Sequence, residues 1–164
     1  MKGSCVNFNT MGKRDSFPVR QSLPHSVPDW VPEGAVFFLT VCTRDRNRAV
    51  LTSGQVPEIL IEGIRYHHDR WAWYCHLFLV MPDHVHGLFS FPPETNMNRL
   101  VTNWKSYTAR LGGFRWQGDF FDHRLRSDES FDEKAAYIRR NPVRAGYVET
   151  HKEWRHWWVP ETAR

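Results

Sequence analysis

Two histidines stand one residue apart in the segment MPDHVHGLF, residues 81–89. The apolar residues around them predict a strand, and side chains two apart on a strand point to the same face, about 7 Å apart along the chain. His84 and His86 therefore share a face and could bind one divalent metal ion together. The alternative is that the two imidazoles only make hydrogen bonds or sit at a sheet edge. Because two ligands rarely suffice for a metal ion, a third must come from elsewhere in the fold.

The last predicted helix offers such a ligand together with a nucleophile. Its apolar stripe comprises three residues: Phe131, Ala135 and Ile138. Tyr137 and Asn141 lie together off that stripe, one turn apart, and they could simply be surface residues. If this helix crosses the histidine face, Asn141 Oδ1 would complete a metal site and the Tyr137 hydroxyl would stand beside the ion. A phosphodiester polarised by a divalent cation is an electrophile that an activated tyrosine attacks, which leaves a phosphotyrosine linkage and a free 3′-hydroxyl. The competing tyrosine, Tyr107, is placed on the buried stripe of its own helix, so the pattern favours Tyr137.

Runs of apolar and β-branched residues predict the strands that must position these residues, and apolar residues at helical spacing predict the helices. Strands are expected at 35–43, 73–81 and 84–91 and within 114–126, and helices at 56–71, from 97 to Gly112–Gly113, and from Ser130. A capping box of Ser130 and Glu133 opens the last helix, which is expected to stop near Asn141 because Pro142 disfavours helix in the residue before it. The stripe expected to bury the middle helix is Met97, Leu100, Val101, Trp104, Tyr107 and Leu111.

The order of these elements predicts an α+β fold, a ferredoxin-like split βαβ sandwich. It would have an antiparallel sheet with helices on one face, plus an extra helix that carries the tyrosine, and the other face would serve binding. We expect an extended N-terminal arm over residues 1–33, the domain itself over 34–150 and a Trp-rich tail over 151–164. The tail tryptophans, Trp154, Trp157 and Trp158, either stack on unpaired bases or pack against the domain.

Composition narrows the class of protein further. The 164 residues carry 22 Lys and Arg against 18 Asp and Glu, which permits a polyanionic partner without requiring one. Three cysteines without Cys-x-x-Cys spacing favour neither a disulfide framework nor a structural zinc site. With no apolar run approaching the ~20 residues of a membrane span, we expect a cytoplasmic, nucleoid-associated protein with no membrane contact.

The basic residues cluster, and some of them are candidates for contacts with phosphate groups, although about half are expected to be ordinary solvated charges. The candidates are Arg44, Arg46, Arg48, Lys105, Arg110, Arg124, Arg126, Arg139, Arg140 and Arg144. Four further histidines have no evident convergent partner and are expected to be structural: His67, His68, His76 and His123. Of these, His76 would matter if it faced the same side as the pair.

The motifs together resemble those of the single-tyrosine HUH transposases, and more narrowly the REP-associated tyrosine transposases. The resemblance spans residues 35–150 through FFLTVCTRDRN, LFLVMPDHVHGLF, WQGDFFDHRLRSDE and AAYIRRNPVRAGYV. It implies a ferredoxin-like nuclease that depends on Mg²⁺ or Mn²⁺ and cleaves and rejoins single-stranded, hairpin-forming DNA through a 5′-phosphotyrosine intermediate. It assigns the metal ligands to His84, His86 and Asn141 and the nucleophile to Tyr137.

Two questions stay open at this point. Members of the wider group act either as monomers or as homodimers, and nothing in the sequence decides between these states. The alternative function is a catalytically inactive, domesticated binder of structured single-stranded nucleic acid, which would hold its ligand through the clustered arginines.

Overall fold

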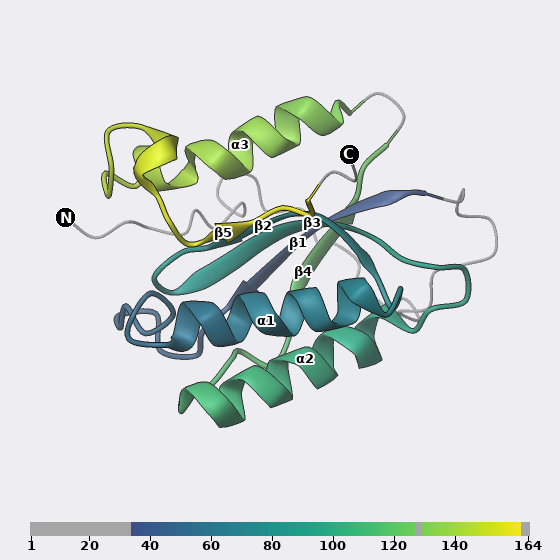
Figure 1. Cartoon of the computed structure of the whole chain (residues 1–164), viewed down its shortest axis with the longest axis horizontal. Coiled ribbons are helices and arrows are strands. Elements are labelled where there is room, and N and C mark those ends of the chain that lie inside the picture. Colours follow the sequence, from purple (N-terminus) through teal and green to yellow (C-terminus); the bar gives the residue numbers. More distant parts are fainter. Residues whose placement is uncertain (1–33, 127–128, 162–164) are drawn as a thin grey trace, which may run out of the picture.

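Five strands form one antiparallel sheet in the order β4-β1-β3-β2-β5, and helices lie on both of its faces. This computed structural model describes residues 34–126 and 129–161 (Figure 1). The elements are β1 (Val36–Cys42), α1 (Val56–Asp69), β2 (Tyr74–Val80), β3 (His84–Ser90), α2 (Met97–Gly112), β4 (Phe121–Arg124), α3 (Phe131–Arg144), a 3₁₀ helix η1 (His151–Glu153) and β5 (Trp157–Trp158). The predicted N-terminal arm, residues 1–33, lies outside the described residues.

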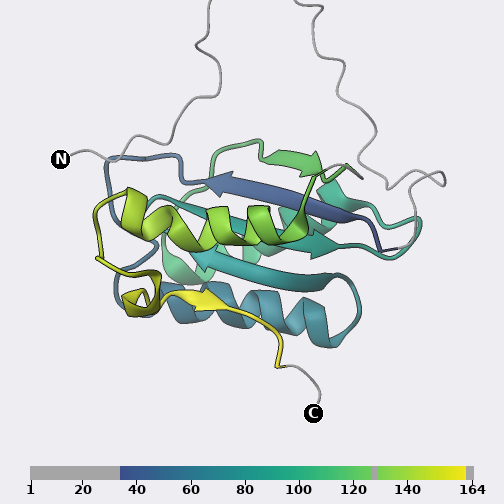
Figure 2. The ribbon, with the colours of Figure 1, turned by 90° about the horizontal axis from the view of Figure 1, so that it is seen from above.

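The first four strands and the two helices between them make the split βαβ arrangement that the sequence predicts. α1 and α2 cover one face of the sheet, while α3 runs across the other face (Figures 1 and 2). The fold class is thus confirmed, with the extra helix lying on the face opposite the other two. β3 is central, since it pairs with β1 on one side and with β2 on the other.

Side-chain alternation along β3 divides the interior into two apolar layers. Val85 and Phe89 point into the larger layer, which packs under α1 and α2 around Trp73, Leu60 and Ile64. The alternate positions point to α3, where Leu88 packs with Leu77, Leu79, Met81, Ala135 and Ile138. His84 and His86 share the face of Leu88, as the period of two requires. The strand is therefore buried on both sides, and its two imidazoles lie between the sheet and α3.

The buried stripe of α2 differs from the predicted one. Tyr107 and Leu111 are 46% and 51% exposed, so their assignment to the core is wrong. The helix instead continues its buried face from Trp104 to Thr108, four residues further on. Thr108 is tolerated there because its hydroxyl donates to the Trp104 carbonyl (2.8 Å) and accepts from Trp116 Nε1 (3.1 Å). A hydrophobicity pattern cannot identify a buried threonine whose polar atom is satisfied in this way.

α3 begins as predicted but ends later. The Ser130 side chain accepts a hydrogen bond from the Glu133 amide (3.3 Å), which caps the first turn. The expected stop near Asn141 is wrong, because the helix continues through Pro142 for two more residues. The missing proline N–H costs one hydrogen bond in the last turn, and the ladder resumes at once with the Ala145 amide donating to the Asn141 carbonyl (2.9 Å). Asn141 is therefore fully helical.

The tryptophan-rich tail packs as part of the sheet. Trp157 and Trp158 form the edge strand β5, which pairs with Leu79 and Phe78 of β2. Trp154 lies against the apolar layer under α3, and its Nε1 donates to the Val80 carbonyl (2.9 Å). Of the two alternatives for the tail, the structure shows packing. None of the helices in the described part of the chain is long and apolar enough to cross a membrane.

Replacing Ile138 by alanine should loosen α3 from the sheet. Ile138 is fully buried against Leu77 and Leu79, so its truncation leaves a cavity and should lower the free energy of unfolding by about 2–5 kcal/mol. Urea unfolding of the two proteins measures the difference. Arg140→Ala, at an exposed position of the same helix, is the matched control and should change stability by less than about 0.5 kcal/mol. Equal effects of the two substitutions would contradict this packing.

Candidate active site

The histidine pair on β3 is buried and rigidly oriented. His84 and His86 are each 7% exposed, and their ring centroids lie 4.7 Å apart. His84 Nδ1 contacts Asp83 Oδ1 at 2.6 Å, and His86 Nδ1 contacts Thr40 Oγ1 at 2.8 Å. With both Nδ1 atoms engaged, the nitrogen that each ring would offer to a metal ion is Nε2. Carboxylate and hydroxyl partners behind metal-binding histidines fix the ring and its tautomer in this manner.

Hydrogen bonds fix Asp83 in place, and Asp83 in turn orients His84. Its second carboxylate oxygen accepts from Arg46 Nε at 3.3 Å. Its carbonyl accepts from both the amide (2.8 Å) and the hydroxyl (3.0 Å) of Thr43 at the end of β1. Burial acts to raise the pKa of Asp83, but the hydrogen bond to His84 and the charge of Arg46 outweigh it, so the pKa lies below its ordinary value. The carboxylate stays ionised and keeps its bond to the ring.

Burial keeps His86 neutral. Desolvation and then the neighbouring His84 lower the pKa of His86 well below its ordinary value of 6.5. The neutral imidazole retains the lone pair that binds metal ions. The ring also stacks on Phe38, with centroids 5.3 Å apart and planes 27° apart. His86 is therefore fixed in position and charge before any ligand arrives.

α3 brings Tyr137 to this pair. The phenol ring lies 6.4 Å from the His86 ring and 6.3 Å from Phe38, measured between centroids. The Arg144 guanidinium lies 5.1 Å from the centre of the same ring. The guanidinium thus makes a cation–π contact with the tyrosine ring. α3 thus crosses the face of β3 that carries the histidines, as the sequence interpretation required.

Asn141 stands one turn beyond Tyr137 and has an unusual side chain. Its Nδ2 atom is buried and has no hydrogen-bond partner among the described residues. Most buried polar atoms are satisfied, so a buried N–H donor without an acceptor is unusual. The atom of this side chain that could bind a metal ion is the amide oxygen, Oδ1. No group of three His, Cys, Asp or Glu that could hold a metal ion occurs in the described ranges, 34–126 and 129–161. A three-ligand site on this face would need the amide as its third donor.

Tyr107, the competing nucleophile, is far from this arrangement. It is exposed rather than buried, so the predicted reason for setting it aside is wrong. It belongs to α2, however, and α2 lies on the opposite face of the sheet from the histidine pair (Figure 1). Its position in the fold separates it from the site.

The basic residues divide into exposed and internally bonded ones. Arg46 is bonded to Asp83, and Arg124 is partly buried on β4. Lys105 is buried, with its ammonium donating to the carbonyls of Gly118 (2.7 Å) and Asp119 (3.4 Å), and burial lowers its pKa. That lysine ties α2 to the segment before β4. The exposed candidates are Arg44, Arg48, Arg110, Arg126, Arg139, Arg140 and Arg144.

The remaining histidines have partners within the fold. His76 does face the α3 side, where its Nε2 contacts Ser90 Oγ at 2.9 Å. Ser90 is four residues from His86 along β3, roughly 13 Å away, so His76 does not join the pair. His123 is paired with Glu129 at 2.8 Å, and the pKa of that carboxyl falls to about 2 through hydrogen bonds from the Arg126 amide and His123.

Two residues of the site had escaped the sequence argument. Thr40 and Asp83 hold the two imidazoles, and neither was a candidate. Asp83 precedes His84 directly, so adjacency alone could have suggested it. Thr40 is found only through the register of β1 against β3, in which it lies opposite His86.

A histidine pair on the central strand, faced by a tyrosine on a helix across the sheet, defines the class of single-tyrosine HUH transposases. The model of the family described as "Transposase IS200 like" matches residues 37–141. The chain belongs to this family and is a transposase. The matched range contains both histidines, the tyrosine and Asn141.

Individual relatives narrow the resemblance. A REP-associated tyrosine transposase of Escherichia coli K12 is 27% identical over 127 residues, covering 74% of each chain. A protein of Haemophilus influenzae, provisionally described in the same terms, is 25% identical over 139 residues, covering 74% of this chain and 78% of its own. A solved REP-associated tyrosine transposase bound to a REP hairpin superimposes with a TM-score of 0.68 at 21% identity, over 90% of this chain and 82% of that one. The expected resemblance to this group is confirmed.

The depressed pKa of His86 should make stability depend on pH in a defined window. In the folded state the ring resists protonation, so stability is fully present above about pH 6.5 and falls as the pH drops below it. The slope from one such group approaches 1.4 kcal/mol per pH unit. Urea unfolding between pH 5 and 7 in chelating buffer should show a shallower slope for His86→Gln than for the native protein.

Some slope should persist in that variant, because burial also lowers the pKa values of His67 and His76. Identical slopes for the two proteins would show that His86 is not held neutral by its surroundings.

Proposed function

We propose that this transposase is a metal-dependent single-strand DNA endonuclease that cleaves and rejoins hairpin-forming DNA through a 5′-phosphotyrosine intermediate on Tyr137. The observation that carries the proposal is the position of Tyr137, 6.4 Å from His86 between ring centroids, on a helix packed over the histidine face. A tyrosine that only packed against the sheet would not need two oriented imidazoles and an unsatisfied amide beside it.

The donor set fits a divalent metal ion. His84 and His86 would offer Nε2, since their Nδ1 atoms are engaged, and the Asn141 side chain would offer Oδ1, which gives two nitrogen ligands and one oxygen ligand. Mg²⁺ and Mn²⁺ are the proposed ions, since both accept oxygen ligands and leave coordination positions for a phosphate. Such an ion, when bound, polarises the phosphodiester and neutralises the charge that develops on its oxygens.

The chain's own residues perform the transfer. The Tyr137 hydroxyl loses its proton to solvent and its oxygen forms a bond to phosphorus, while the bond from phosphorus to the 3′-oxygen breaks and that oxygen gains a proton. Arg144 holds the tyrosine ring through a cation–π contact, with its guanidinium 5.1 Å from the ring centre. Rejoining runs the same step backwards, with a 3′-hydroxyl attacking and Tyr137 leaving. Because one phosphodiester is exchanged for another, no external energy source is needed.

A hairpin-forming single strand is the proposed substrate. The relative solved with a REP hairpin shares this fold, and the exposed Arg139 and Arg140 extend from the helix that carries the tyrosine. Arginines so placed supply the contacts with phosphate groups that fix a strand over the site without reading its sequence.

Tyr137→Phe should abolish the covalent product. The native protein, incubated with hairpin oligonucleotides and Mn²⁺, should yield a DNA adduct that survives denaturing electrophoresis, and a chelator should prevent it. Phenylalanine keeps the ring packing against Phe38 but lacks the attacking oxygen. Tyr107→Phe, at an exposed position on the opposite face, is the matched control and should form the adduct at the native rate.

An adduct that persists in Tyr137→Phe would exclude this residue as the nucleophile. Salt-dependent binding by the native protein, with no cleavage under any metal, would instead support the inactive binder that the sequence left open.

Asn141→Ala should weaken metal binding directly. Loss of a ligand should raise the dissociation constant for Mn²⁺ by on the order of tenfold or more, since even outer partners of metal ligands are worth about 10–100-fold. Titration followed by the electron paramagnetic resonance of free Mn²⁺ measures this without DNA. Asn103→Ala, at an exposed position on α2, should bind Mn²⁺ as the native protein does. Native affinity in Asn141→Ala would remove the amide from the proposed ligand set.

A further inference from the structure

A lysine on α3 lies beside the candidate active site and has no part in the chemistry described so far. Lys134 stands three residues before Tyr137 and seven before Asn141, so the helical repeat places all three on one side of α3. Residues three apart on a helix have their Cβ atoms about 5–6 Å from each other. The lysine therefore belongs to the same polar stripe as the proposed nucleophile.

The ring of Phe38 lies beside this lysine and beside two central residues of the site. The Lys134 ammonium is 5.9 Å from the centre of that ring. The same ring stacks on His86, at 5.3 Å between centroids, and meets Tyr137 edge to face, at 6.3 Å. The ammonium and the phenol thus border the same ring, on the α3 side of the sheet.

One carboxylate holds the lysine, and it does so at long range. Lys134 Nζ lies 3.7 Å from Glu129 Oε1, beyond the length of about 2.7–3.2 Å that a direct hydrogen bond has. The other oxygen of Glu129 accepts from the Arg126 amide (2.9 Å) and contacts His123 Nε2 (2.8 Å). Those bonds lower the pKa of Glu129 to about 2, so the carboxylate stays ionised.

The ammonium therefore has donors to offer to a ligand. This ion pair is the one that Lys134 makes within residues 34–126 and 129–161, and its side chain forms no hydrogen bond there. About a third of the side chain (34%) is exposed to solvent. A lysine ammonium carries three rotatable N–H donors, and phosphate oxygens are acceptors that suit it.

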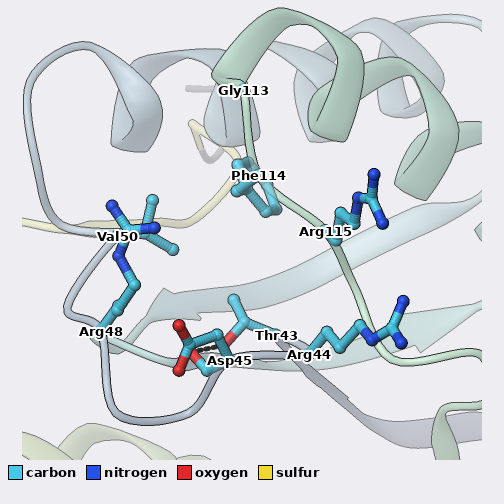
Figure 3. A pocket seen from close by; sticks show the side chains of 8 residues that line it. All are labelled: Thr43, Arg44, Asp45, Arg48, Val50, Gly113, Phe114 and Arg115. Atoms are coloured by element: carbon cyan, nitrogen blue, oxygen red, sulfur yellow. Dashed lines mark hydrogen bonds between the residues drawn. The ribbon is translucent and has the colours of Figure 1, made fainter.

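Other cations of the described residues are placed differently. Arg144 lies over the face of the Tyr137 ring, where it makes a cation–π contact. A separate group of arginines extends into the cleft between the loop after β1 and the segment that links α2 to β4 (Figure 3), and no residue of α3 lines that cleft. Among these groups, Lys134 is the cation that lies both on the stripe of the nucleophile and beside Phe38.

We propose that Lys134 is a further catalytic residue, whose ammonium donates hydrogen bonds to the phosphoryl group that passes between the DNA strand and Tyr137. The inference rests on the proposed function, in which this group becomes bonded to the tyrosine oxygen. A flexible side chain one turn away on the same helix can stay with the phosphoryl group through that transfer. Lys134 forms and breaks no covalent bond, and it exchanges the distant Glu129 carboxylate for phosphate oxygens.

Lys134→Met removes the charge and keeps an unbranched apolar side chain beside Phe38. In the full-length protein with saturating hairpin DNA and Mn²⁺, the rate of adduct formation should fall on the order of tenfold or more, because a donor to the developing charge is lost. Lys134→Arg, which keeps a charge and donors, should recover part of that rate. Lys152→Met removes an exposed lysine from η1 and is the matched control, which should react at the native rate.

Glu129→Gln separates a catalytic lysine from a purely structural ion pair. It breaks the same ion pair as Lys134→Met but leaves the ammonium in place, so adduct formation should fall much less than in Lys134→Met. Equal losses in the two variants would assign the effect to the ion pair and overturn the inference. A native rate in Lys134→Met would overturn it as well.

A second measurement needs neither DNA nor cleavage. Protein made with phosphotyrosine at position 137 carries a phosphate where the covalent intermediate would have one, and phosphorus NMR in chelating buffer follows its titration. A nearby ammonium favours the doubly charged phosphate, so this phosphate should titrate at a lower pH than in the same protein with Lys134→Met. Identical titrations would mean that the ammonium does not reach the phosphate. If the native protein forms no adduct, the proposed function fails, and the titration alone then decides this inference.

Discussion

The apolar packing of α3 against the sheet sets the position of this helix, and the proposed chemistry depends on that position. Ala135 and Ile138 pack into the layer formed by Leu77, Leu79 and Leu88. The helical repeat sets the positions of Tyr137 and Asn141 relative to that stripe, and docking of the stripe brings the Tyr137 ring to 6.4 Å from the His86 ring, between centroids. The same apolar packing therefore sets the positions of both Tyr137, the proposed nucleophile, and Asn141, the proposed third ligand. Burial of the apolar face of α3 thus determines where its polar face, with the proposed catalytic residue, lies.

Most of this arrangement could be predicted from the sequence, because the periods of strands and helices are set by neighbouring residues along the chain. The period of two in β3 placed His84 and His86 on one face, and the helical period placed Tyr137 beside Asn141. What it could not supply was cross-strand register, which aligns Thr40 with His86. It also misplaced Tyr107 in the core, since the buried position fell to Thr108, whose hydroxyl finds partners only in the folded chain. Errors arose where satisfaction of polar atoms, rather than hydrophobicity, decided burial.

The surroundings of His86 and the segment that follows β1 differ in charge. Around His86, burial removes water and disfavours positive charge, so the ring is kept as a neutral donor. Just after the end of β1, Arg44 and Arg48 are exposed to solvent. Neutral nitrogen donors suit a metal ion, whereas fixed cations suit phosphate groups directly. Asp83 joins the two environments, since its carboxylate contacts both His84 and Arg46.

Lys105 links α2 to the segment before β4 through its buried ammonium group. A buried ammonium requires acceptors, and the carbonyls of Gly118 and Asp119 provide them. This bond ties α2 to the segment that carries Arg115, which in turn is bonded to Arg44 through the backbone. The buried ammonium therefore holds α2 next to the segment from which Arg115 extends.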